Sequence, residues 1–287
     1  MRRMRSIILD AVTHFNNDDG WAMASHVALS ILMALFPFMI FGTALASFLG
    51  ANAYAETASH LIFDTWPESI ARPISREVIN VLTIERGGLL TISVLAAAFF
   101  SANGVEALRV SLNRAYRMTE TRPWYVTRAQ SLGFVVIAVL VIISISFLLV
   151  LAPLALKLAR QFAPWMEPLI SAVDTWRILV AVSVLVVGLV MSHLWLPAGE
   201  RKLSDVIPGI GVTLIAWIAG ALAFARYLQE FATYVSTYAG LASIMVALVF
   251  LYIIAAIFIL GAEFNAAILK ARVLAEMEVK KEASSET

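Results

Sequence analysis

The stretch GLASIMVALVFLYIIAAIFILGA, residues 240–262, contains no Asp, Glu, Lys or Arg in 23 positions. About 20 apolar residues cross a bilayer as a helix, and a charge at its centre costs about 2.5–3.5 kcal/mol. This stretch is therefore predicted to span a membrane. The whole chain is 61% hydrophobic and 14% charged, against about 45–50% and about 25% in soluble domains. A soluble core of 287 residues could not bury so much apolar surface.

Five further charge-poor runs resemble this one, and together the six predict six transmembrane helices. The expected spans lie near 24–49, 88–105, 130–153, 178–196, 207–225 and 240–262. A membrane β-barrel would instead show alternating segments of about 10 residues, which are absent here. We therefore predict an all-α integral membrane protein with six transmembrane helices and short amphipathic interfacial helices.

The distribution of Lys and Arg predicts the orientation, because loops on the cytoplasmic side carry an excess of both. With the N-terminus inside, fourteen basic residues fall in inner segments and seven in outer segments. Both termini are therefore predicted to be cytoplasmic. Six of the seven tryptophans also fall at predicted span ends or in loops, where aromatic side chains gather at membrane surfaces.

Three regions outside the spans complete the predicted organisation. Residues 1–21 form a cytoplasmic segment in which Ile8, Val12 and Phe15 share one helical face, as in an interfacial helix. Residues 22–265 form the transmembrane domain, and its outer loop, 51–87, is expected to fold as amphipathic helices. Residues 266–287 form a cytoplasmic tail, whose polar end beyond Met277 is expected to be disordered.

The segment FFSANGVEALRVSLNRAYRMTETRPWYVTR, residues 99–128, carries the densest set of polar side chains. If the second helix continues beyond the bilayer, helical spacing places four of them on one face, with Arg114 beside them. The four are Glu106, Arg109, Asn113 and Arg117. Arginine presents planar donors that suit phosphate or carboxylate, so the face is a candidate site for an anionic group. The alternative is that these arginines only hold the loop in the cytoplasm.

Other polar side chains in or near the spans are further candidates. Glu263 and Asn265 lie where the last helix leaves the inner leaflet, and we expect Glu263 to pair with Arg109 or Arg114 as a structural or a proton-coupling carboxylate. Asn103 is assigned to the same substrate site, although a hydrogen bond between helices is its commoner role. His26 and His193 lie near the inner face, as a proton relay or as ordinary interfacial hydrogen bonders.

Several function classes are excluded by missing residues. The chain has no cysteine, which excludes disulfides, thiolate metal sites and thiol nucleophiles. It has no GxxxxGK[ST], HExxH or G-x-S-x-G sequence, and no cluster of acids and histidines for a metal. We therefore expect no cofactor, no metal and no enzymatic activity. The net charge of +1 gives no reason to expect nucleic acid as a partner.

Four segments, taken in order, resemble the YihY/BrkB family of bacterial inner-membrane proteins, formerly misnamed ribonuclease BN. They are SHVALSILMALFPFM (25–39), SANGVEALRVSLNRAYR (101–117), LPAGERKLSDVIPG (196–209) and STYAGLASIMVALVFLYIIAAIFILGAEFNAAI (236–268). The resemblance covers about residues 15–270, and implies six helices and a place in the bacterial cytoplasmic membrane. One departure is His26–Val27, where the family has an Ala-Tyr pair. The resemblance implies no settled biochemical function.

The sequence favours a permease or lipid-handling transporter that has no ATPase of its own and acts on an anionic lipid or another amphipathic substrate. Its expected partners are membrane lipids and such a substrate, and a homo-oligomer is left open. The second hypothesis is a structural or assembly protein of the envelope that acts through the 51–87 loop. The third, an intramembrane enzyme, lacks convergent acid, base and nucleophile residues.

Overall fold

The computed structural model describes residues 2–48, 89–162, 165, 167–230 and 239–285, and the regular elements in these ranges are all helical. This confirms the predicted all-α class. The elements are α1 (Arg2–Asn17), α2 (Gly20–Phe48), α5 (Leu89–Ala115), α6 (Trp124–Ser146), the π-helical turn η2 (Phe147–Leu151), α7 (Ala152–Phe162), α8 (Glu167–Trp195), α9 (Leu203–Glu230) and α11 (Ala239–Ser285). The predicted amphipathic loop at 51–87 lies outside the described residues.

Five helices in the described residues are long and apolar enough to cross a membrane. The candidate spans are Gly20–Phe38, Trp124–Leu149, Ile170–Trp195, Leu203–Leu228 and Ile244–Glu282. They correspond to five of the six predicted spans. The remaining one, 88–105, falls in α5, whose last three turns carry Glu106, Arg109 and Arg114 and so make the helix as a whole less apolar.

The chain divides into two compact units, each of which is described by itself. The smaller unit, 30–104, contains the second part of α2 and the first part of α5. These two helices meet at Gly104, where an added Cβ would lie 3.7 Å from Ile31 Cγ1. The larger unit, 1–29 with 105–287, contains the remaining helices and every site described below.

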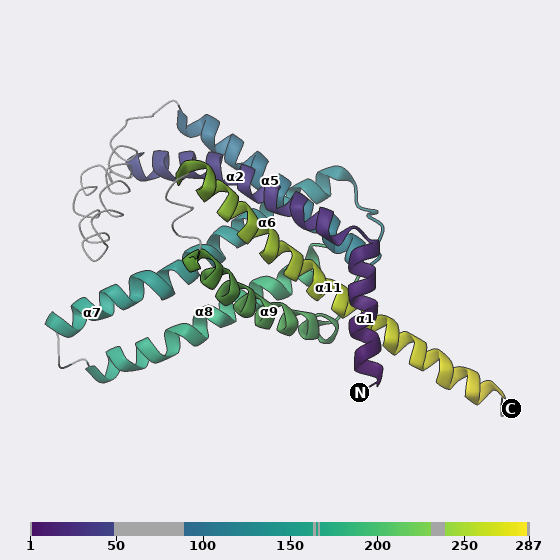
Figure 1. The fold of residues 1–287 in the computed structure, drawn as a ribbon. Helices are drawn as coiled ribbons and strands as arrows, with labels where there is room; N and C mark the ends of the chain where they lie inside the picture. Colours follow the sequence, from purple (N-terminus) through teal and green to yellow (C-terminus); the bar gives the residue numbers. More distant parts are fainter. Residues whose placement is uncertain (1, 49–88, 163–164, 166, 231–238, 286–287) are drawn as a thin grey trace. The chain divides into compact units, whose positions relative to one another are not determined.

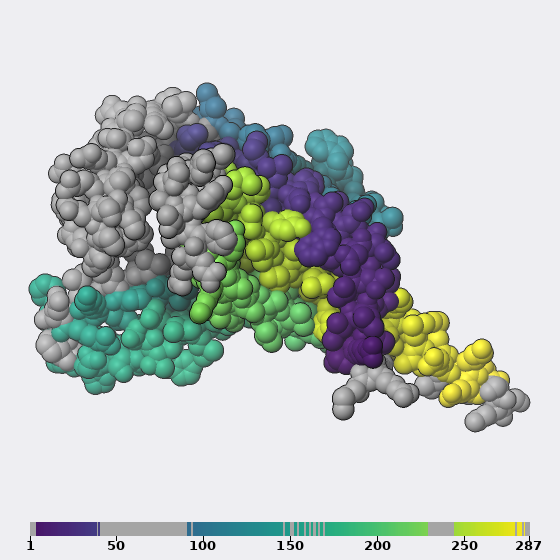
Figure 2. Space-filling model, viewed as in Figure 1, coloured from purple at the N-terminus to yellow at the C-terminus, as the bar shows by residue number. Residues whose placement is uncertain are grey.

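Helix α1 packs across the middle turns of α11 (Figures 1 and 2). Ile7 and Ala11 are buried there against Ala267, and Lys270 Nζ donates to Asp10 Oδ1 over 2.7 Å. Of the three residues on the predicted membrane-facing side of α1, Ile8 and Val12 are exposed and Phe15 is buried. Helix α11 packs against the neighbouring face of α1, which carries Ile7 and Ala11. The exposed side chains of Ile8 and Val12 therefore remain available to a membrane surface.

The predicted disorder beyond Met277 is wrong, because α11 continues without interruption to Ser285. The Ala-, Glu- and Lys-rich sequence of residues 274–283 has high intrinsic helix propensity. The helix is also anchored at its middle turns, where Lys270 binds Asp10 and Arg272 binds Asp205. A long helix that is already nucleated extends at little cost into such a sequence.

Helices α9 and α11 approach each other closely through small residues. A Cβ added to Gly209 would lie 2.1 Å from the Gly261 carbonyl oxygen, and one added to Gly261 would lie 2.0 Å from Thr213 Oγ1. Neither position has room for any larger residue. Asn265 joins the helices at the same crossing, since its Oδ1 accepts from the Gly209 N–H at 2.6 Å and its Nδ2 donates to the Val206 carbonyl.

Helix α6 continues through η2 into α7 and then returns as α8. Ion pairs join α7 to α8, with Arg160 Nε 3.3 Å from Glu167 Oε1 and Arg160 Nη2 3.7 Å from Asp174 Oδ2. Near its other end, α8 packs on α6 and α9. The end of α8 at Trp195 therefore lies close to the beginning of α6, and this places the loop 196–202 beside the end of α5.

Candidate functional site

The end of α5 is shaped by a left-handed residue at Arg117, whose φ is 56°. The Met118 N–H bonds the Asn113 carbonyl at 2.7 Å, and the Arg117 N–H bonds the Arg114 carbonyl at 3.0 Å. These two bonds form a Schellman motif, in which glycine usually takes the left-handed position. The arginine therefore occupies a position that costs backbone energy, and its side chain leaves the helix in a different direction from Arg114.

Arg109 lies at the centre of an ion network and is almost fully buried. Its guanidinium binds Glu106 one turn earlier on α5 and Glu120 in the loop that follows. Glu106 also accepts from Ser131 Oγ of α6 at 3.2 Å. Burial alone would lower the pKa of Arg109, but its bonds to Glu106 and Glu120 outweigh burial and raise it. Arg109 is therefore a permanently charged brace between α5, α6 and the loop.

Glu120 is the shared acceptor of this network. It receives Arg122 Nε at 2.7 Å, Asn113 Nδ2 at 3.0 Å and a donor from Arg109. The bonds from Arg122 are the largest cause that holds the pKa of the Glu120 carboxyl well below its usual range, and they outweigh the opposing effect of burial. Sequence reasoning missed Glu120, although it is the only acid between Arg117 and Arg122.

The expected pairing of Glu263 was wrong. Glu263 on α11 is buried and binds Arg117, with Nη2 3.4 Å from Oε2. Arg109 is occupied by Glu106 and Glu120, and the exposed Arg114 lies 3.5 Å from Asp19 Oδ2 instead. The reason is the left-handed turn at the end of α5, which directs Arg117 rather than its helical neighbours toward α11.

Four residues of the predicted anion-binding face and its surroundings line one cavity of about 550 Å³, which we call the α5 pocket. They are Arg109, Asn113, Arg114 and Arg117, and the other lining residues are Asp18, Val110, Met118, Thr119 and Glu120. Glu106, Glu263 and Asn265 are not on its wall. Asn103 lies on α5 within the 30–104 unit, so the structure gives no relation between Asn103 and this pocket.

The two predicted relay histidines have different environments. His26 is exposed on α2, whereas His193 is fully buried near the end of α8. His193 Nδ1 lies 2.8 Å from the Tyr116 hydroxyl, which also accepts Asn265 Nδ2 at 3.2 Å. Burial raises the pKa of Tyr116 to about 12. Tyr116, which the sequence did not single out, therefore joins three helices through neutral hydrogen bonds.

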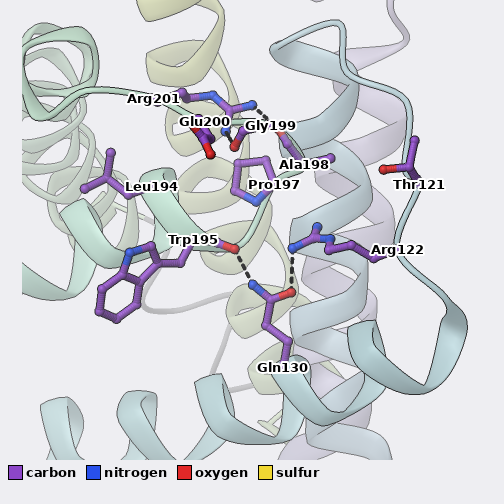
Figure 3. A pocket seen from close by; sticks show the side chains of 10 residues that line it. All are labelled: Thr121, Arg122, Gln130, Leu194, Trp195, Pro197, Ala198, Gly199, Glu200 and Arg201. Carbon is purple, nitrogen blue, oxygen red and sulfur yellow. Dashed lines mark hydrogen bonds between the residues drawn. The ribbon is translucent and has the colours of Figure 1, made fainter.

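A second polar cavity, of about 650 Å³, lies between the beginning of α6, the end of α8 and the loop that follows (Figure 3). We call it the 195–201 pocket. Gln130 bridges its wall, since its Nε2 donates to the Trp195 carbonyl and its Oε1 accepts Arg122 Nη1 at 2.6 Å. Arg201 Nη2 donates to the Ala198 carbonyl at 2.6 Å. Gly199 has a φ of 83°, which glycine adopts easily.

The loop of this pocket is fixed to α5. The Ala198 N–H donates to Asn113 Oδ1 at 2.6 Å, and the Arg201 guanidinium carbon lies 4.1 Å above the Tyr116 ring. Asn113 thus bonds both the loop and Glu120, and its own side chain lines the α5 pocket. No group of three or more His, Asp or Glu side chains that could hold a metal ion occurs in the part of the chain that the structure describes.

Five helices of membrane-spanning length and composition define a membrane-embedded α-helical protein. The chain belongs to the virulence factor BrkB family, whose profile matches residues 11–287. It is 30% identical over 274 residues to the "Putative ribonuclease-like protein YfkH" of Bacillus subtilis (strain 168), covering 94% of this chain and 97% of that protein.

A second relative is the UPF0761 membrane protein RC1_0578 of Rhodospirillum centenum (strain ATCC 51521 / SW). The identity is 26% over 273 residues, which is 91% of this chain but 56% of that longer protein. No solved structure matches the chain at a significant level. The predicted family is therefore confirmed, and neither relative's name describes what this chain carries or binds.

Proposed function

We propose that this protein is a carrier for an anionic amphipathic molecule, whose charged group binds in the α5 pocket. The observation that carries the proposal is the contrast between the arginines of that pocket. Arg109 is buried and held by two carboxylates, whereas Arg114 and Arg117 each have one ion pair, at 3.5 Å and 3.4 Å. The side chains of Arg114 and Arg117 are 44% and 34% exposed.

Long ion pairs are easily exchanged for a better acceptor. An Arg–carboxylate or Arg–phosphate contact is strongest when two N–H groups bind two oxygens at about 2.7–2.9 Å. Neither Arg114 nor Arg117 has such a contact, so a phosphate or carboxylate in the pocket would gain bonds that Asp19 and Glu263 do not provide. The braced Arg109–Glu120 network behind them supplies a fixed wall, which preorganises the site.

The location of the pocket favours an amphipathic ligand. It lies at the end of α5 and next to Asp18, directly before the span that begins at Gly20. A charged group bound there would be near the membrane surface, while an attached apolar chain could remain in lipid. An ATP-driven mechanism is not proposed, because the chain contains no phosphate-binding GxxxxGK[ST] sequence.

The carrier proposal includes six spans with both ends of the chain in the cytoplasm of a bacterial inner membrane. The contact between α1 and residues 264–271 of α11 supports an even number of crossings. Helix α2 starts immediately after α1, so its beginning and the exit of α11 lie on the same side. Five crossings would place the beginning of α2 and the exit of α11 on opposite sides of the membrane. The proposed sixth crossing is α5.

The test is to identify molecules that co-purify with the protein in native lipid nanodiscs by mass spectrometry. The informative variant is Arg114→Gln/Arg117→Gly/Glu263→Gln, which removes both cations without leaving Glu263 charged and unpaired. Glycine suits the left-handed position of residue 117. The matched control is Glu263→Gln alone, and Arg226→Gln controls for the loss of an exposed cation elsewhere.

We expect one class of anionic amphiphile to be enriched in the wild type and in both controls, and to be lost from the triple variant. The same bulk lipids in all four samples would contradict the proposal. That result would favour the alternative in which the protein assembles with an envelope partner.

A further inference from the structure

The 195–201 pocket contains an arginine that no carboxylate neutralises within the part of the chain that the structure describes. The hydrogen bonds of Arg201 go to the carbonyl oxygens of Ala198 and Gly199, at 2.6 Å and 3.4 Å. By contrast, Arg109, Arg117 and Arg122 all bind glutamates. Carbonyl groups satisfy N–H donors but leave the positive charge in place.

Arg201 is also held in a fixed position. Its guanidinium stacks on Tyr116, and the Tyr116 hydroxyl is bonded to both His193 and Asn265. An arginine held on an aromatic ring loses less side-chain freedom when it binds a ligand. Burial lowers the pKa of Arg201, Tyr116 partly opposes this effect, and the nearby charge of Arg122 adds to the lowering, so an added anion would favour the charged form of Arg201.

The charges that line the pocket favour an anion. Arg122 is neutralised by Glu120, so the remaining charges are those of Arg201 and Glu200. Glu200 is exposed, and in Figure 3 its side chain and that of Arg201 lie at the same end of the pocket. The arginine is thus the fixed charge and the glutamate the solvated one.

The position of the pocket indicates the source of the anion. Trp195 ends one candidate span and Trp124 begins another, and the two residues are 57% and 78% exposed. Tryptophans at span ends lie at the level of the lipid head groups. The pocket between these helix ends is therefore at the depth where phospholipid phosphates lie.

We propose that the 195–201 pocket binds the phosphate group of an anionic phospholipid, with Arg201 as its main ligand and Gln130 and Trp195 beside it. This site is separate from the α5 pocket and does not depend on the carrier function. A free phosphate ester shares the same chemistry, and the experiment below distinguishes the two sources.

The probe is phosphatidylglycerol, added to delipidated protein and measured by native mass spectrometry, with phosphatidylcholine as the uncharged comparison. Losing one charge-assisted contact costs about 1.5–3 kcal/mol, so Arg201→Gln should weaken phosphatidylglycerol binding about tenfold or more. Lys202→Gln, an exposed neighbour, is the matched control and should change binding less than about twofold.

Because Arg201 also stacks on Tyr116, its replacement could disturb the fold. Glu200→Gln avoids this problem, since it removes only an exposed competing charge, and it should strengthen binding about threefold. Unchanged binding in both Arg201→Gln and Glu200→Gln would overturn the proposal. So would equal affinity of the wild type for phosphatidylglycerol and phosphatidylcholine.

Inorganic phosphate at millimolar concentration distinguishes the sources. If it leaves bound phosphatidylglycerol in place, the lipid is the ligand, as we propose. If it displaces the lipid in the wild type at concentrations that have no effect on Arg201→Gln, the site is a soluble phosphate site, and the phospholipid assignment is overturned.

Discussion

Arg117 Nη2 lies 3.4 Å from Glu263 Oε2, and this ion pair joins the left-handed end of α5 to the buried face of α11. The buried Glu263 carboxylate is thus paired with an arginine that also lines the α5 pocket. A ligand that takes the arginine must therefore change the environment of Glu263. The two residues should therefore act together.

Arg117→Gly should destabilise the protein, because it leaves Glu263 buried without its partner. The same substitution should cost much less in a Glu263→Gln background, where no buried charge remains. Coupled pairs typically show interaction energies of about 0.5–3 kcal/mol. The four proteins of this double-mutant cycle can be compared by thermal unfolding in one detergent. Strictly additive effects would mean that the pair contributes no coupling.

Gly209→Ala should disrupt the crossing of α9 and α11, because its Cβ would lie 2.1 Å from the Gly261 carbonyl oxygen. Overpacking of this kind costs about 1–3 kcal/mol, and backbone atoms can yield little. Gly211→Ala is the matched control, since nothing lies within 4 Å of its added Cβ. A lowered unfolding midpoint for the first variant alone is expected, and equal midpoints would contradict the close packing.

Glu120 should make the folding stability of the protein fall more steeply as the pH is lowered. Its folded pKa is lowered from an ordinary value of 4.5, so its contribution is present above that value and is lost as the pH falls toward the folded pKa. Glu120→Gln should be less stable than the wild type at neutral pH, and the difference should shrink below about pH 4.5. Unfolding midpoints measured between pH 7 and pH 3 check this, and parallel curves would refute it.

The two ends of the chain should be accessible from the same side of the membrane. Because the natural sequence has no cysteine, Asn17→Cys and Glu278→Cys each introduce a single label site, both on exposed residues. Both should resist a membrane-impermeant maleimide in intact cells and react after permeabilisation. Labelling of only one in intact cells would indicate an odd number of crossings.

The sequence predicted the helical class and the approximate spans because charge-free runs of about 20 residues have few other uses. It also predicted that Arg109, Asn113 and Arg114 lie together, since helical spacing depends only on local order. It did not predict Arg117 with Glu263, or Tyr116 with His193, because both depend on how α5 ends and on packing between distant helices. The left-handed conformation at position 117 in particular was not indicated by a glycine, because the residue there is arginine.

The tail shows a different limit of sequence reasoning. A polar composition suggested disorder beyond Met277, but Ala, Glu and Lys are also strong helix formers. The structure resolves this ambiguity through α1, which packs on Ala267 and binds Lys270, so that the first turns beyond the last span are already fixed.

The central claim, movement of an anionic amphiphile that depends on the α5 pocket, can be measured in proteoliposomes. Fluorescent phosphatidylglycerol and phosphatidylcholine serve as probes, and an impermeant quencher reports how fast each reaches the outer leaflet. We predict faster movement of phosphatidylglycerol in the wild type and in Glu263→Gln, and protein-free rates in Arg114→Gln/Arg117→Gly/Glu263→Gln. Equal, protein-free rates for both lipids in wild-type vesicles would contradict the account.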